Sequence, residues 1–89
     1  MYRIIDSAST GKTSRLLLLA KEHDGVVVCL NPIKLRQKAY NYGITGVCII
    51  SYEDYMNHNY TSNKVFIDDV EDFLRFQNPD VAGYTLNKD

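Results

Sequence analysis

This chain of 89 residues contains no tryptophan, two prolines and two cysteines. Cys29 and Cys48 do not have the spacing of a metal site, and His23 and His58 lie far from them in sequence. Both cysteines sit inside apolar runs. We therefore expect two small core residues of a protein from a reducing compartment.

An excess of charge of either sign is also absent, since the net charge is −1 and the sequence pI is about 6.0. A general surface for nucleic acid or for an anionic membrane needs clustered lysine and arginine, so the charge supports neither partner. The one local basic run contains Lys34, Arg36 and Lys38. A solvated helix face explains that run most simply.

Long apolar runs are missing as well, and none of the apolar stretches could span a bilayer. No basic-then-apolar signal region precedes the first expected strand. The hydrophobic fraction of 45% is sufficient for a core, so disorder is not expected. We expect residues 1–89 to form one small, soluble, cytoplasmic domain.

Short apolar segments alternate with helical patterns along the chain. Asn31 and Pro32 are typical of a helix N-cap and first helical position, and Ser51 is suited to cap the next helix. Such alternation predicts βαβ crossovers and an α/β fold: a three-layer α/β/α domain with a five-stranded, mainly parallel sheet. The strands are expected at 2–5, 25–30, 46–51, 64–68 and 81–86, and the helices at 13–23, 32–43, 52–56 and 70–77.

Two segments place polar residues at the carboxyl ends of expected strands, where ligands bind open α/β sheets. The first is Asp6-Ser7-Ala8-Ser9-Thr10-Gly11-Lys12-Thr13, which leads directly into a leucine-rich helix. Backbone N–H groups at such a loop hold an anion, and the lysine adds a point charge. The second is Lys64-Val65-Phe66-Ile67-Asp68-Asp69, an apolar strand ending in two acids.

Together these segments resemble the Walker A and Walker B motifs of P-loop NTPases. Nearly the whole chain resembles the first motor domain of helicases and the wider RecA-like branch. The resemblance implies ATP and Mg²⁺ as cofactors, with Asp69 polarising an attacking water and Lys12 contacting the β/γ-phosphates. Thr13 and Asp68 would hold the metal, and the nucleotide-binding residues would be Ser9, Thr10, Gly11, Lys12 and Thr13.

The family carries a polar sensor residue on a strand between the two Walker strands. Gly83-Tyr84-Thr85 falls at that place, so segment 81–86 is expected between 2–5 and 64–68, with 25–30 and 46–51 beyond. Lys12 is expected on the first turn of its helix, within reach of Asp68 or of a bound anion.

Three departures separate the chain from the family pattern. Asp6 replaces the first glycine of Walker A, and Ser9 stands where helicase variants carry glycine. Glycine lets the backbone approach phosphate, whereas serine in a left-handed conformation costs roughly 1 kcal/mol. Asp69 replaces the usual glutamate. Asp6 either repels phosphate, faces away from it or helps to hold Mg²⁺.

Three function classes stay open. One is a minimal ATP-binding domain, or a weak Mg²⁺-dependent NTPase that needs an oligomer or a protein partner. Another is a degenerate P-loop domain that acts, without nucleotide, as a protein- or nucleic-acid-interaction module with an inhibitory or regulatory role. A small nucleotide or nucleoside kinase is least favoured, because the chain has no room for a lid.

Each motif also has a purely structural interpretation. Ser7, Ser9 and Thr10 would simply cap the leucine-rich helix, and the acids from Asp68 onward would complement the dipole of the next helix. The seven tyrosines invite a base-stacking role for the pairs Tyr40–Tyr42 or Tyr52–Tyr55. A place at the rim of a small core is the simpler assignment.

Overall fold

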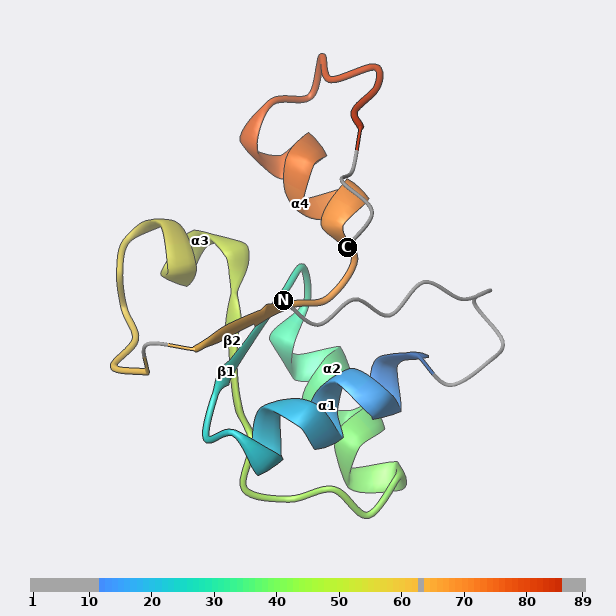
Figure 1. The fold of residues 1–89 in the computed structure, drawn as a ribbon, viewed down its shortest axis with the longest axis vertical. Coiled ribbons are helices and arrows are strands. Elements are labelled where there is room, and N and C mark those ends of the chain that lie inside the picture. The colour runs from blue at the N-terminus through green and yellow to red at the C-terminus, as the bar shows by residue number, and fades with distance from the viewer. Residues whose placement is uncertain (1–11, 63, 86–89) are drawn as a thin grey trace.

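The computed structural model describes residues 12–62 and 64–85. In this part of the chain the three strands form a parallel sheet in the order β2-β1-β3 (Figure 1). Val26 of the central strand pairs with Cys48 on one side and with Val65 on the other. The elements are α1 (Lys12–Glu22), β1 (Val26–Cys29), α2 (Pro32–Asn41), β2 (Cys48–Ser51), α3 (Tyr52–Met56), β3 (Val65–Ile67) and α4 (Val70–Gln77).

Helices cover both faces of the sheet because the central strand is apolar on both sides. All four residues of β1 are buried, which is typical of a parallel strand with helices above and below. Val27 packs with Leu17 of α1 and Leu35 of α2. Val28 packs with Tyr52 of α3 and Phe73 of α4. Figure 1 shows α1 and α2 together on one side of the sheet and α3 on the other.

The expected helix caps are confirmed. The side chain of Asn31 accepts a hydrogen bond from the Lys34 N–H at 3.2 Å, and Pro32 occupies the first position of α2. Ser51 Oγ accepts from the Asp54 N–H at 3.0 Å and starts α3 directly at the end of β2. These caps place the helix starts at the carboxyl ends of the strands.

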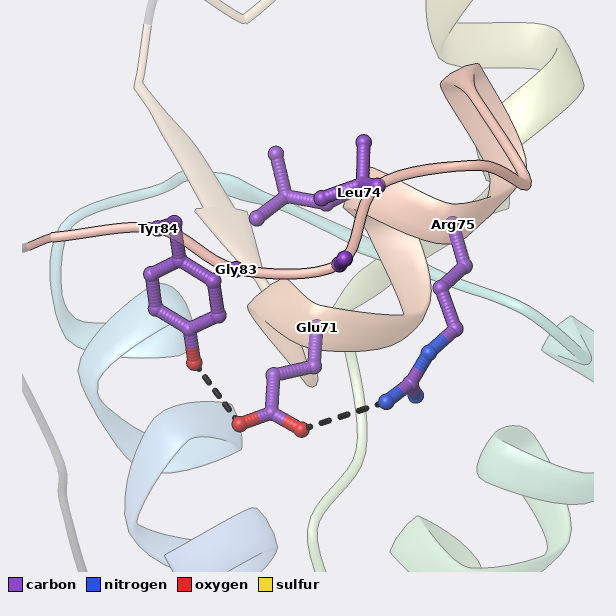
Figure 2. A pocket seen from close by; sticks show the side chains of 7 residues that line it. Glu71, Leu74, Arg75, Gly83 and Tyr84 are labelled. Carbon is purple, nitrogen blue, oxygen red and sulfur yellow. Dashed lines mark hydrogen bonds and ion pairs between the residues drawn. The ribbon is translucent and has the colours of Figure 1, made fainter.

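The expectation of a five-stranded sheet is wrong. Residues 81–85 form no strand, and the chain turns back along α4 instead (Figure 2). The Val81 N–H donates to the Asn78 carbonyl at 3.1 Å, which closes a turn immediately after the helix. The Tyr84 hydroxyl then donates to Glu71 Oε1 at 2.7 Å, so the segment is held on α4 rather than beside β3.

The remaining predicted strand, 2–5, lies outside the described residues. The position of 81–86 between two Walker strands is therefore wrong for its described part. The expectation that 25–30 and 46–51 lie beyond 64–68 agrees with the observed order β2-β1-β3. Segment 81–84 and α4 enclose a small surface hollow of about 160 Å³.

Each helix in the two described ranges is too short or too polar to span a bilayer.

The two cysteines differ. Cys29 is buried as expected, but Cys48 is exposed, so its assignment to the core is wrong. Cys48 is the first residue of β2, which has β1 on one side only within the described sheet, and burial in this strand is complete only at Ile49. Its apolar neighbours in sequence did not indicate this position at the start of an outer strand.

Candidate functional site

Asp68 lies at the carboxyl edge of the sheet, directly after β3. Its N–H donates to the Val28 carbonyl at 2.9 Å, which continues the pairing of β3 with the central strand by one residue. The backbone of Asp68 is therefore attached to the middle of the sheet. This is the edge at which parallel α/β sheets bind ligands.

The carboxyl group of Asp68 is half-buried and surrounded by charges of both signs. Burial raises its pKa, and the neighbouring charge of Asp69 raises it further. The ammonium groups of Lys38 and Lys12 act in the opposite direction. A partly desolvated carboxylate whose pKa is lowered by cations on two helices is found at ligand sites and in structural ion pairs alike.

Lys12 opens α1, as expected, and its charge acts on Asp68. Thr13 follows it in the first turn and is half-buried. The other residues predicted to bind nucleotide, Ser9, Thr10 and Gly11, lie outside the described residues. The charge at the start of α1 therefore acts on the carboxyl group at the end of β3.

Lys38 is a residue that sequence reasoning assigned to a solvated helix face. It is exposed on α2, yet its effect on the pKa of Asp68 is larger than that of Lys12. Its neighbour Arg36 has a structural role, because its guanidinium donates to the Ile49 carbonyl of β2 at 2.7 Å. No motif distinguishes Lys38, and the only sequence signal was its place on the helix that follows the central strand.

Asp69 has a structural role of its own. Its backbone has φ 62° and ψ 84°, a left-handed conformation that aspartate tolerates better than most residues. Its Oδ1 accepts from the Asp72 N–H at 3.2 Å and caps α4. Burial raises the pKa of the Asp72 carboxyl group. The negative charge of Asp69 raises this pKa further, and so does a hydrogen bond between the Asp69 and Asp72 side chains. The structural alternative to the predicted role of Asp69 in polarising water was an acidic helix start that complements the helix dipole, and the observed cap adds a hydrogen bond to that role.

A magnesium ion bound with a nucleotide makes modest demands on the protein. It usually takes one or two protein ligands and fills its other positions with phosphate oxygens and water. Among the residues that the structure describes, no three His, Cys, Asp or Glu side chains are grouped to hold a metal ion alone. The half-buried carboxylate of Asp68 fits the smaller requirement, with the Thr13 hydroxyl as the second predicted ligand.

The two candidate stacking pairs differ in exposure. Tyr40 and Tyr42 are exposed on and just after α2, at 78% and 50%. Tyr52 is buried in the core, and the ring of Tyr55 packs against Tyr60 and Phe73. A base-stacking role is therefore compatible with the first pair only.

Tyr52 is the second residue that sequence reasoning missed at this edge. Its hydroxyl donates to the carbonyl oxygens of Asp68 at 2.8 Å and Asp69 at 3.1 Å. Burial raises the pKa of Tyr52, and the charges of Asp72, Asp69 and Asp68 raise it further, so the hydroxyl remains a donor at neutral pH. Only its place after the cap at Ser51 pointed toward the edge.

Comparison with known proteins identifies no relative. No protein-family model matches the chain, and neither a curated protein nor a solved structure is significantly similar to it.

Proposed function

We propose that this chain binds ATP with Mg²⁺ at the carboxyl edge of its parallel sheet, in the manner of the P-loop NTPases that its motifs resemble. One observation carries the proposal. The carboxylate of Asp68, whose backbone is bonded to the central strand, is half-buried, and the charge of Lys12 at the start of α1 lowers its pKa. This electrostatic coupling supports a site in which the acid holds the metal and the lysine binds phosphate.

The roles follow from the chemistry of the side chains. Lys12 contacts the β/γ-phosphates as a point charge, while backbone N–H groups of Ser9, Thr10 and Gly11 complete the anion site. Thr13 and Asp68 hold the metal. Bound Mg²⁺ neutralises phosphate charge and also offsets the cost of burying the Asp68 carboxylate.

Binding is favoured over rapid hydrolysis. Asp69 already accepts the hydrogen bond that caps α4, and its backbone is held in a left-handed conformation. It is also one methylene shorter than glutamate, so it is less suited to polarise water. Efficient turnover would therefore require an oligomer or a protein partner that completes the site.

Isothermal titration calorimetry of ATP, with Mg²⁺ and with EDTA, tests the proposal. We expect weak binding that Mg²⁺ strengthens, and a loss of at least about tenfold in Lys12→Ala because a charge-assisted contact to phosphate disappears. Lys34→Ala is the matched control, since Lys34 is exposed on α2. Circular dichroism should show the same folded spectrum for all three proteins. Equal binding by wild type and Lys12→Ala would contradict the proposed site.

A degenerate P-loop module without nucleotide is the second candidate. It is favoured by the use of Asp69 as a helix cap and by Asp6 and Ser9 in place of glycines. Ser9→Gly should tighten ATP binding about fivefold if a P-loop conformation strains serine. If wild type, Ser9→Gly and Asp6→Gly all fail to bind ATP, the domain acts through a protein partner instead.

A further inference from the structure

Tyr52 belongs to α3 and packs against α4 on the same face of the sheet. It is the first residue of α3, and only 1% of its surface is exposed. Its ring packs edge-on against Phe73 of α4, with ring centroids 5.1 Å apart, and lies 5.5 Å from the ring of Phe76. The ring alone therefore accounts for the packing of this residue.

The hydroxyl of Tyr52 does something that packing does not require. It donates to two consecutive backbone carbonyl groups, that of Asp68 at 2.8 Å and that of Asp69 at 3.1 Å. Consecutive carbonyls of an extended strand point in opposite directions. Here they converge on one donor, and Asp69 has a φ of 62°, which is uncommon for a residue other than glycine.

The backbone of Asp68 is consequently held on both sides. Its N–H is bonded to Val28 of the central strand at 2.9 Å, and its carbonyl is bonded to Tyr52. The next residue, Asp69, is held by its cap to the Asp72 N–H at 3.2 Å. The direction in which the Asp68 side chain leaves the backbone follows from these bonds.

We propose that Tyr52 is a positioning residue for the Mg²⁺ site, whose hydroxyl holds the Asp68–Asp69 backbone so that the Asp68 carboxylate stays at the carboxyl edge of the sheet. This inference rests on the proposed binding of ATP and Mg²⁺. Tyr52 acts through the backbone of Asp68 and does not itself ligate the metal.

The matched variants are Tyr52→Phe and Tyr55→Phe. Each removes one hydroxyl from α3 and keeps the aromatic ring, and the ring of Tyr55 packs against the same Phe73 at 5.8 Å. The measured quantity is the ratio of ATP affinity with Mg²⁺ to ATP affinity in EDTA. In Tyr52→Phe this ratio should fall about tenfold, as expected for one lost hydrogen bond, while affinity in EDTA stays unchanged.

Tyr55→Phe should retain the wild-type ratio. An unchanged ratio in Tyr52→Phe, or an equal loss in both variants, would overturn the positioning role. A general loss of stability would not produce the expected pattern, because it would weaken ATP binding in EDTA as well.

Amide hydrogen exchange of the nucleotide-free protein separates this inference from the proposed function. The Asp68 N–H should exchange about tenfold faster in Tyr52→Phe than in wild type. The Val26 N–H, bonded to Lys64 at the other end of the sheet at 2.9 Å, should be unaffected. If wild type binds no ATP, the proposed function fails. Exchange at Asp68 then decides alone whether Tyr52 holds this backbone: acceleration supports that part of the inference, and unchanged exchange overturns it.

Discussion

At the scale of single residues, the partly buried carboxylate of Asp68 lowers the stability of the fold, and the same carboxylate is the proposed ligand of Mg²⁺. Burial and the charge of Asp69 raise its pKa, and Lys38 and Lys12 offset this only in part. In the unfolded chain the carboxyl ionises at a lower pH than in the fold. Stability therefore falls as the pH rises from the unfolded pKa to the folded one, and the ionised group remains unfavourable at neutral pH.

Asp68→Asn should accordingly stabilise the protein at neutral pH, because the amide has the same size and no charge. The gain should vanish in acid, below the ordinary range of a carboxyl group. Urea unfolding at the two pH values measures it. Asp80→Asn, in the exposed turn after α4, is the control and should show no such gain. A variant less stable than wild type at neutral pH would show that Lys12 and Lys38 outweigh the burial.

The same substitution should lower Mg²⁺-dependent ATP binding if Asp68 holds the metal. Residues at functional sites often reduce stability in this way, since the property that binds a ligand is unfavourable without it. An Asp68→Asn protein that is both more stable and unchanged in Mg²⁺ dependence would separate the carboxylate from the proposed site.

At the scale of elements, Gly25 joins α1 to β1 where the backbone has no space for a side chain. Its N–H donates to the Ala20 carbonyl at 2.8 Å, and this bond lies at the end of α1. A Cβ atom there would lie 2.5 Å from Phe66 Cε1 and 3.0 Å from the Lys64 carbonyl oxygen. The carbonyl belongs to the backbone beside β3 and cannot move away easily.

Gly25→Ala should therefore lower the free energy of unfolding by about 1–3 kcal/mol through overpacking. Gly83→Ala is the matched control, because no atom lies within 4 Å of a Cβ built there. Its effect should stay within about 0.5 kcal/mol. Chemical denaturation of both variants measures the difference, and equal stabilities would mean that Phe66 moves aside at no cost.

Arg36 connects α2 to the outer strand β2. Its guanidinium donates a hydrogen bond to the Ile49 carbonyl at 2.7 Å. A charged side chain of the helix is therefore bonded to the backbone of the strand. Arg36→Ala should cost about 1.5–3 kcal/mol, the range for hydrogen bonds to charged groups. Lys34→Ala on the same helix should change stability by less than about 0.5 kcal/mol. Thermal unfolding compares the stabilities of the two variants. A similar loss of stability in both would mean that removing a positive charge from α2, rather than the bond to Ile49, causes the effect.

At the scale of the whole molecule, one short strand links two separate hydrophobic clusters. Val27 belongs to the cluster under α1 and α2, and Val28 to the cluster under α3 and α4. Both side chains are fully buried. Because neighbouring residues of a strand face opposite sides, the central strand makes each cluster depend on the other.

Val27→Ala and Val28→Ala should each lower the free energy of unfolding by about 2 kcal/mol. Each should also keep a single cooperative transition. Ile33→Ala, at a site 76% exposed, is the control and should have little effect. Far-ultraviolet circular dichroism in urea measures all three. Two separated transitions in either valine variant would show that the clusters unfold independently.

The sequence by itself determined the local features of this protein. The three described strands lie within the predicted ranges, and Asn31 and Ser51 cap the predicted helices. These features depend on β-branched runs and on caps that act over three residues, so a local pattern contains the information.

Only the tertiary structure decided which distant residues meet. Segment 81–85 has the composition of a strand but lies on α4, because the turn at Asn78 and the bond from Tyr84 to Glu71 hold it there. Lys38 and Tyr52 act on Asp68 across the sheet edge, although neither belongs to a motif. Such contacts depend on strand order and on where each helix packs, and these are set by burial of the whole core rather than by neighbours along the chain.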